Sequence, residues 1–128
     1  MCWYAGPPVL LRQLPFIAAH VAHPDRPVVA ITGDGGFMFG MQELSTAVQF
    51  KIGVVVLVFN NNSYGNVRRD QRQHFEGRVV ASDLVNPDFV KLAESFGVGA
   101  ARVTSRRSLL SSASAAFDNG KVASHILR

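Results

Sequence analysis

PVVAITGDGG, at residues 27–36, is the stretch that decides the fold, and GVVVLVFNNN at residues 53–62 has the same layout. Each begins with a continuous run rich in β-branched residues, which is typical of a strand buried on both faces of a parallel sheet. Between the two runs, apolar residues recur at helical spacing and predict one connecting helix: Met38, Met41, Leu44 and Val48. A strand, a helix and a second strand form a right-handed crossover, so the two strands should be parallel neighbours.

The alternation of helices and strands continues to the end of the chain. Asn86-Pro87-Asp88 resembles a helix cap with proline in the first turn, and the apolar face that follows it ends at Gly97. Residues 98–103 predict a short strand, residues 105–117 a helix, and residues 122–127 a last strand. The expected fold class is therefore α/β: a doubly wound parallel sheet with helices on both faces. We expect a single domain, either whole or truncated.

Length, composition and cysteine content narrow the functional classes. With 128 residues, of which 48% are hydrophobic, the chain has room for one domain with one core. The longest apolar run, Val54–Phe59, is too short to span a bilayer, and the first thirty residues contain five prolines, which disrupt a signal peptide. We therefore expect a cytoplasmic location and no membrane partner. The single cysteine, Cys2, excludes a disulfide framework and a cysteine-based metal site.

The net charge of +4 comes from the second half of the chain. Residues 61–128 contain ten basic and six acidic residues, and four of the basic residues lie close together: Arg68, Arg69, Arg72 and Arg78. Asp70 and Glu76 interrupt this cluster and no recognition motif surrounds it, so we expect no nucleic-acid partner. Two interpretations of the cluster stay open, a solvated face or a rim that attracts an anionic cofactor.

A glycine-rich turn with one carboxylate, Gly33-Asp34-Gly35-Gly36, follows the first predicted strand. In an open α/β sheet, ligands bind at the carboxyl ends of the strands. The turn is not a dinucleotide fingerprint, which would need glycine in place of Met38, nor a Walker loop, which would need lysine in place of Met41. Glycines let the backbone approach an anion, but Asp34 would repel a bare phosphate. We therefore expect a divalent cation between them.

Asparagines at the end of the second predicted strand supply further oxygen atoms. The run Val54–Phe59 leads directly into Asn60-Asn61-Asn62, which should emerge beside Asp34 if the two strands are neighbours. Ligand sets made only of oxygen suit magnesium or calcium and disfavour zinc. The sequence therefore predicts a site for a hard cation that bridges protein oxygens and a phosphate group.

Gly33-Asp34-Gly35, followed by 24 residues and then Asn60-Asn61, resembles the cofactor signature of thiamine-diphosphate-dependent enzymes. The similarity continues through the loop at residues 61–66. It is strongest to the C-terminal, pyrophosphate-binding domain of the acetolactate synthase and 2-oxo acid decarboxylase group. The resemblance assigns residues 14–128 to that domain and leaves residues 1–13 as an unmatched N-terminal segment.

The resemblance implies two cofactors, thiamine diphosphate and Mg²⁺. The implied metal ligands are Asp34, the side-chain oxygen of Asn61 and the backbone carbonyl of Ser63. The other implied contacts are with the cofactor's diphosphate, through glycine backbone and two flanking side chains: Gly33, Gly35, Gly36, Gly65, Tyr64 and Asn66. Hard oxygen ligands and close backbone approach agree with the expectations drawn from the residues themselves.

The resemblance also implies an incomplete catalytic apparatus. In this family a glutamate from a separate pyrimidine-binding domain activates the cofactor, and Glu43, Glu76 and Glu94 do not match it, so no catalytic residue is assigned here. One interpretation is a part or subunit of a lyase or transferase, completed by a pyrimidine-binding domain or subunit in a homo- or hetero-oligomer. The alternative is a stand-alone fragment or degenerate product that binds the cofactor diphosphate without catalysis.

Overall fold

The computed structural model describes residues 14–105, 107–109, 111–112 and 123–127. Its centre is a four-stranded sheet in the order β1-β2-β4-β3. The strands are β1 (Val28–Gly33), β2 (Val54–Phe59), β3 (Gly99–Val103) and β4 (Ala123–Leu127). All neighbouring strands are parallel. The predicted parallel pairing of the first two strands is confirmed, and so are the two later strands. The burial on both faces predicted for β1 is wrong, because β1 is an edge strand of the described sheet and Val29 and Ile31 on its outer face are exposed.

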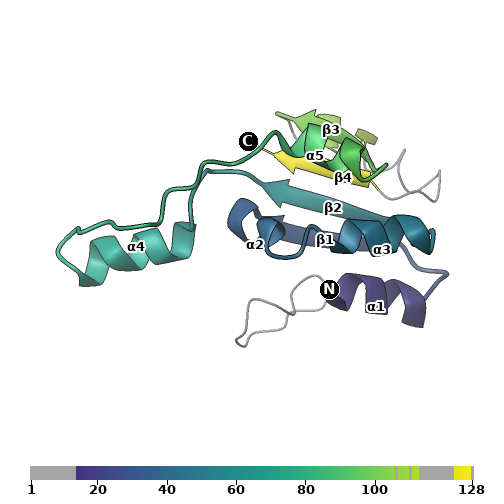
Figure 1. The fold of residues 1–128 in the computed structure, drawn as a ribbon, viewed down its shortest axis with the longest axis horizontal. Coiled ribbons are helices and arrows are strands. Elements are labelled where there is room, and N and C mark those ends of the chain that lie inside the picture. The colour runs from purple at the N-terminus through teal and green to yellow at the C-terminus, as the bar shows by residue number, and fades with distance from the viewer. Residues whose placement is uncertain (1–13, 106, 110, 113–122, 128) are drawn as a thin grey trace.

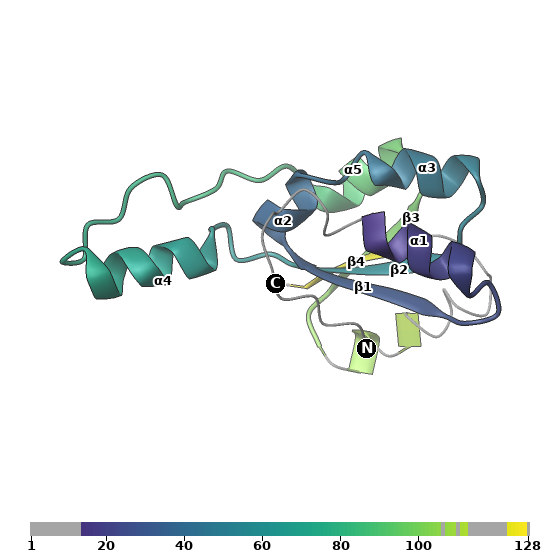
Figure 2. The same ribbon diagram turned by 90° about the horizontal axis from the view of Figure 1, so that it is seen from below.

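Helices alternate with the strands along the chain, as expected for an α/β fold. They are α1 (Leu14–Ala22), α2 (Asp34–Met38), α3 (Glu43–Gln49), α4 (Gly65–His74) and α5 (Phe89–Ser95). Helices α2, α3 and α5 lie on one side of the sheet, and helical residues 107–109 lie on the other (Figure 2). The remainder of the helix predicted at 105–117 falls mostly outside the described residues. Among the described helices, none is long and apolar enough to cross a bilayer.

The core lies between the sheet and helices α2, α3 and α5. Its buried side chains come from the inner face of the strands and from the helices facing them: Ala30, Val54, Val56, Val58, Ile126, Phe37, Leu44, Ala47, Phe89 and Ala93. The rings of Phe37 and Phe89 meet edge to face with centroids 5.5 Å apart. Burying a phenylalanine contributes roughly 1.5–3 kcal/mol, so this contact joins α2 firmly to α5.

The prediction of one continuous helix between β1 and β2 is wrong, because the structure has two short helices there, α2 and α3. The backbone N–H groups of residues 43–45 each donate to the carbonyl three residues earlier, a tighter turn than the α-helix. Gly40 lies in this junction, and glycine disfavours helix by about 1 kcal/mol relative to alanine. Met38 and Val48, predicted on the buried face, are exposed, and Ala47 is buried instead.

Helix α5 confirms the helix predicted after Asn86-Pro87-Asp88. Asp88 is the N-cap, and its side chain accepts a hydrogen bond from the backbone N–H of Val90 at 3.0 Å. Pro87 therefore precedes the cap instead of lying in the first turn. Gly97 follows the helix with φ of 78°, a left-handed conformation that glycine adopts without steric cost.

Residues 60–88, which we call the arm, leave the sheet and return to it (Figure 1). The arm contains α4, which the sequence patterning did not predict, since none of its residues is buried and it lacks an apolar stripe. Its outgoing and returning segments are joined where the N–H of Tyr64 donates to the carbonyl of Ser82 at 2.8 Å. The Gln71 side chain also donates to the carbonyl of Val80 at 2.8 Å, which fixes α4 to the returning segment.

Candidate functional site

The carboxyl ends of β1 and β2 meet at one edge of the sheet. The register pairs Gly33 with Phe59, so the next residues, Asp34 and Asn60, leave the sheet side by side. Asp34 begins α2, and only 2% of its surface is exposed. Because an ionised carboxylate is costly to bury unless a cation or hydrogen bonds compensate it, this side chain is suited to a positively charged ligand.

Two neutral donors contact the Asp34 carboxylate. The backbone N–H of Gly35 donates to Oδ1 at 2.9 Å, and the side-chain amide of Asn86 donates to Oδ2 at 2.7 Å. Within the described part of the chain, no ion pair involves Asp34. The carboxylate is therefore hydrogen-bonded, while its charge has no basic side chain to balance it.

Three side-chain oxygens converge on one nitrogen, Nδ2 of Asn86. They are Oδ2 of Asp34 at 2.7 Å, Oδ1 of Asn60 at 2.9 Å and Oδ1 of Asn62 at 3.3 Å. The amide carries two hydrogens, so three acceptors exceed what it can satisfy with ideal geometry. Carboxylate and amide oxygens are the donors that magnesium prefers, so these oxygens fit a hard cation. The sequence analysis did not place Asn86 in the site, since its sequence neighbourhood indicates only the start of a helix and the fold alone brings it to Asp34.

Asn61 faces a different group from its neighbours. Its Oδ1 accepts hydrogen bonds from the backbone N–H of Ser63 at 3.1 Å and from Oγ of Ser63 at 3.2 Å. Asn60 makes a similar turn with the N–H of Asn62, which has φ of 55°. Such side-chain turns are the reason that asparagine favours tight loops. The structure thus brings Asn61 and Ser63 together, while the contacts described for Asp34 go to Gly35 and Asn86.

Glycine at position 35 makes room for an aromatic ring at the edge of the site. A Cβ atom there would lie 2.7 Å from Cδ1 of Tyr64, closer than real Cβ atoms approach. The Tyr64 ring in turn stacks on Phe39, with centroids 6.4 Å apart. A Cβ on Gly36 would lie 2.9 Å from Oγ1 of Thr32, so this position is also confined. Both glycines let α2 lie close to its neighbours.

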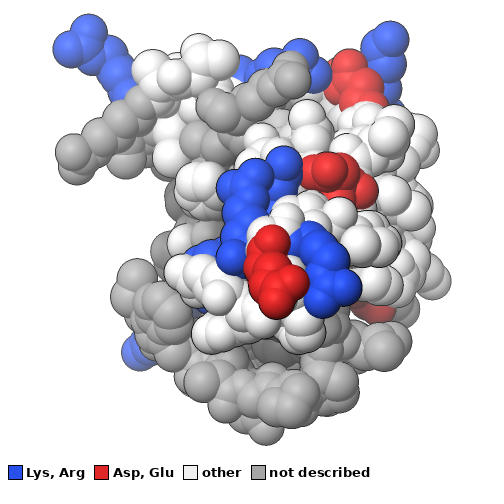
Figure 3. Space-filling view, turned by 90° about the vertical axis from the view of Figure 1, so that its left-hand side faces the viewer, with Lys and Arg blue, Asp and Glu red and all other residues white. Residues whose placement is uncertain are grey.

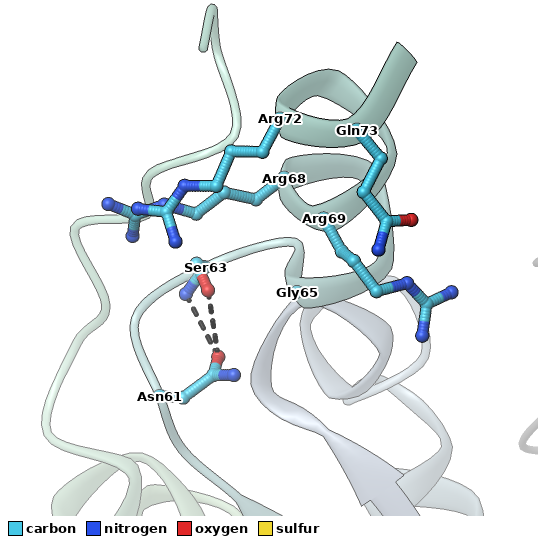
Figure 4. Close-up of a pocket in the computed structure, with 7 residues that line it drawn as sticks. All are labelled: Asn61, Ser63, Gly65, Arg68, Arg69, Arg72 and Gln73. Atoms are coloured by element: carbon cyan, nitrogen blue, oxygen red, sulfur yellow. Dashed lines mark hydrogen bonds between the residues drawn. The ribbon is translucent and has the colours of Figure 1, made fainter. Parts of the chain in front are cut away.

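An open pocket of about 470 Å³ lies between the turn at residues 61–65 and α4 (Figure 4). Three predicted site residues and three arginines line it, together with a glutamine: Asn61, Ser63, Gly65, Arg68, Arg69, Arg72 and Gln73. Arg78, the fourth arginine of the cluster, is not among its lining residues. Of the two interpretations of the cluster, the structure favours a basic rim beside the predicted cofactor residues.

The remaining predicted residues lie around the same edge of the sheet. Gly33 is the last residue of β1, and Asn66 lies exposed in the first turn of α4. Among the described residues, no cluster of three histidine, cysteine, aspartate or glutamate side chains could hold a metal ion. A cation bound here would therefore rely on one carboxylate together with amide and carbonyl oxygens, a ligand set that fits magnesium.

One family model matches most of the chain. The family model described as "Thiamine pyrophosphate enzyme, C-terminal TPP binding domain" matches residues 12–126. Thiamine pyrophosphate (TPP) is the same compound as thiamine diphosphate. The matched region includes β1, β2 and the arm, and hence both strand ends that form the site.

Individual relatives are much longer than this chain. The probable acetolactate synthase large subunit of Methanococcus aeolicus is 44% identical over 90 residues, 70% of this chain and 15% of that protein. The mitochondrial acetolactate synthase catalytic subunit of Aspergillus candidus is 46% identical over 87 residues, 68% of this chain and 12% of that protein. The chain thus spans less than a fifth of the length of either relative.

A solved structure has the same fold. The thiamine diphosphate-dependent 4-hydroxybenzoylformate decarboxylase of Rhodococcus jostii RHA1 superposes with a TM-score of 0.86 at 29% sequence identity. The superposition covers 93% of this chain and 23% of that chain. The parallel sheet, its helices and the arm therefore correspond to one part of a larger protein architecture.

Proposed function

We propose that the chain binds thiamine diphosphate in a magnesium-dependent manner, because it belongs to the family of C-terminal TPP-binding domains of thiamine pyrophosphate enzymes. We further propose that it does so as the pyrophosphate-binding part of an enzyme like acetolactate synthase or a 2-oxo acid decarboxylase. The coarser statement, that this is a TPP-binding domain with relatives among the acetolactate synthases, follows from the family match and the relatives.

One observation carries the proposal: the buried carboxylate of Asp34 lies among amide oxygens at the ends of β1 and β2, and no basic side chain of the described residues pairs with it. A magnesium ion requires oxygen donors of this type and commonly bridges them to a diphosphate. The same edge of the sheet offers glycine backbone for close approach. These features support a cation-bridged diphosphate better than a bare phosphate.

We assign three proposed cation ligands: Asp34, the side-chain oxygen of Asn61 and the backbone carbonyl of Ser63. Asn61 and Ser63 line the pocket beside α4, where the diphosphate would be held. When bound, thiamine diphosphate supplies the carbanion-stabilising group for reactions of 2-oxo acids. The residues of this chain bind and orient that cofactor, and the Asn61 turn must release its hydrogen bonds to Ser63 if its oxygen is to face a cation.

The reaction itself requires residues beyond this chain. Each relative is several times longer, and the aligned parts cover 12% to 23% of the compared proteins. We therefore propose that a pyrimidine-binding domain or subunit supplies the activating glutamate. The alternative is a fragment that binds the cofactor diphosphate without catalysis, and the two differ in whether such a partner restores turnover.

Calorimetric titration of thiamine diphosphate into the protein, with and without Mg²⁺, tests the proposal. We expect binding that requires Mg²⁺ and that Asp34→Ala abolishes, since it removes the only carboxylate at the three-oxygen cluster. The matched control is Asp25→Ala, which removes an exposed carboxylate from the turn before β1. Binding that is independent of Mg²⁺, or equally strong in Asp34→Ala, would contradict the proposed site.

A further inference from the structure

One face of α4 carries basic side chains. Their spacing along the helix is the spacing that apolar residues usually have on the buried face of a helix. The pocket-lining positions of the helix follow the pattern i, i+3, i+4, i+7, i+8: Gly65, Arg68, Arg69, Arg72 and Gln73. Residues at this spacing share one side of a helix. Like charges three or four residues apart destabilise a helix, so the basic face disfavours α4 unless a ligand compensates it.

The geometry of the arm turns this face toward the pocket. Gln71 on α4 contacts the returning segment at Val80 and accepts a hydrogen bond from Oγ of Ser82 at 2.9 Å. In Figure 4 the side chains of Arg68 and Arg72 extend from the helix in the same direction, above Ser63 and Asn61. The two guanidinium groups therefore approach the turn that carries the proposed cofactor residues.

The positive charge of this face is only partly compensated. Nη1 of Arg68 pairs with Asp83 at 2.8 Å, but Nε of Arg68 is buried without a hydrogen-bond partner among the described residues. Arg72 forms no ion pair within the described part of the chain. No acidic side chain is among the described residues that line the pocket.

The acidic residues at this end of the molecule lie beside the arginines but outside the pocket lining. Figure 3 faces that end and shows acidic side chains interspersed with the basic ones. Asp83 and Asp70, which pair with Arg68 and Arg69, have side chains that are 69% and 55% exposed. Exposed pairs of this kind are weak, so they leave the guanidinium groups available to a stronger acceptor.

We propose that Arg68 and Arg72 form an oxyanion site on the α4 side of the pocket. The planar guanidinium group donates in a fork that matches both carboxylate and phosphate oxygens. Two anions fit that chemistry: a phosphate group of the cofactor or the carboxylate of a 2-oxo acid. The choice of these two rests on the proposed function, whereas the basic pocket itself does not depend on it.

Titration of the full chain with inorganic pyrophosphate, and separately with pyruvate, both without Mg²⁺, tests the oxyanion site. Arg72→Gln removes one guanidinium and should weaken binding about ten- to hundredfold, the range for hydrogen bonds to charged groups. The matched control is Arg78→Gln, which makes the same charge change on the arm outside the pocket. It should change affinity less than about twofold, since Arg78 is exposed and does not line the pocket, and salt screens exposed charges that make no direct contact. Circular dichroism of each variant verifies that the helical content is retained.

Each outcome bears directly on the proposal. Loss of pyrophosphate binding in Arg72→Gln identifies a phosphate site, and loss of pyruvate binding identifies a carboxylate site. Equal losses in Arg72→Gln and Arg78→Gln, or no binding of either anion by the unmodified chain, would overturn the oxyanion site. Because Mg²⁺ is absent, failure of this experiment is distinct from failure of the Mg²⁺-dependent binding that involves Asp34.

Discussion

The substitution Gly35→Ala should weaken the cofactor site while leaving the protein folded. A Cβ atom at this position would lie 2.7 Å from Cδ1 of Tyr64 and 3.2 Å from Cδ1 of Leu84. The Tyr64 ring is half-buried and can swing outward, but doing so breaks its stacking on Phe39. Tyr64 also precedes α4 and follows Ser63, so its movement shifts the turn that lines the pocket.

Two effects of opposite sign set the magnitude for stability. Extra atoms in a close-packed position typically cost about 1–3 kcal/mol, while alanine in place of glycine within a helix gains up to about 1 kcal/mol. The free energy of unfolding should therefore fall by about 0–3 kcal/mol. Magnesium demands near-ideal ligand geometry, so displacement of the turn should weaken Mg²⁺-dependent binding of thiamine diphosphate at least about tenfold.

Urea denaturation and calorimetric titration measure these two quantities on the same preparation. Gly99→Ala is the matched control, because a Cβ atom there meets nothing within 4 Å. It should change the free energy of unfolding by less than about 0.5 kcal/mol and leave binding unaffected. If Gly35→Ala binds the cofactor as tightly as Gly99→Ala does, Tyr64 and its turn do not form the site as described.

Three further predictions concern the site and its completeness. Asn61→Ala should abolish Mg²⁺-dependent diphosphate binding in calorimetry, and unchanged binding would exclude Asn61 as a ligand. Asn86→Ala removes the amide donor to Asp34, so urea denaturation should show a loss of about 1.5–3 kcal/mol without cation and a smaller loss with Mg²⁺ and cofactor bound. Equal losses of stability in the two conditions would show that Asn86 does not contribute to the cation site. The isolated chain should leave exchange of the cofactor's C2 proton at the free-cofactor rate in proton NMR, since none of its three glutamates matches the activating glutamate that the family resemblance implies. Enhanced exchange would show a more complete catalytic apparatus.

The central part of the fold could be predicted from the sequence because its signals are local. The β-branched runs predict the strands β1 and β2, and the parallel pairing of these strands follows from the crossover between them, although the runs do not distinguish the edge strand β1 from the buried strand β2. That pairing was enough to bring Asp34 and Asn60 to the same edge of the sheet. One helix was predicted between the strands where the structure has two, because the spacing of apolar residues does not indicate the tight turn that follows Gly40.

The arm and the contacts of Asn86 could not be predicted in the same way. Helix α4 buries none of its residues, so it has no apolar stripe to detect, and its basic face becomes meaningful only beside Asn61 and Ser63. Asn86 lies 52 residues from Asp34 in the chain, and its nearby sequence indicates only a helix cap. Long-range contacts of this kind depend on the path of the arm, which local patterns do not encode.

Manganese substitution gives the most direct test of the central claim, that a divalent cation is held by Asp34, Asn61 and Ser63 together with the cofactor diphosphate. Mn²⁺ takes similar oxygen ligands, and its unpaired electrons broaden NMR signals of nearby nuclei. With Mn²⁺ and thiamine diphosphate present, the side-chain amide of Asn61 and the backbone amide of Ser63 should broaden beyond detection. Gln49, exposed at the end of α3, should keep its side-chain signal. Sharp Asn61 and Ser63 signals, or broadening equal to that of Gln49, would contradict the account.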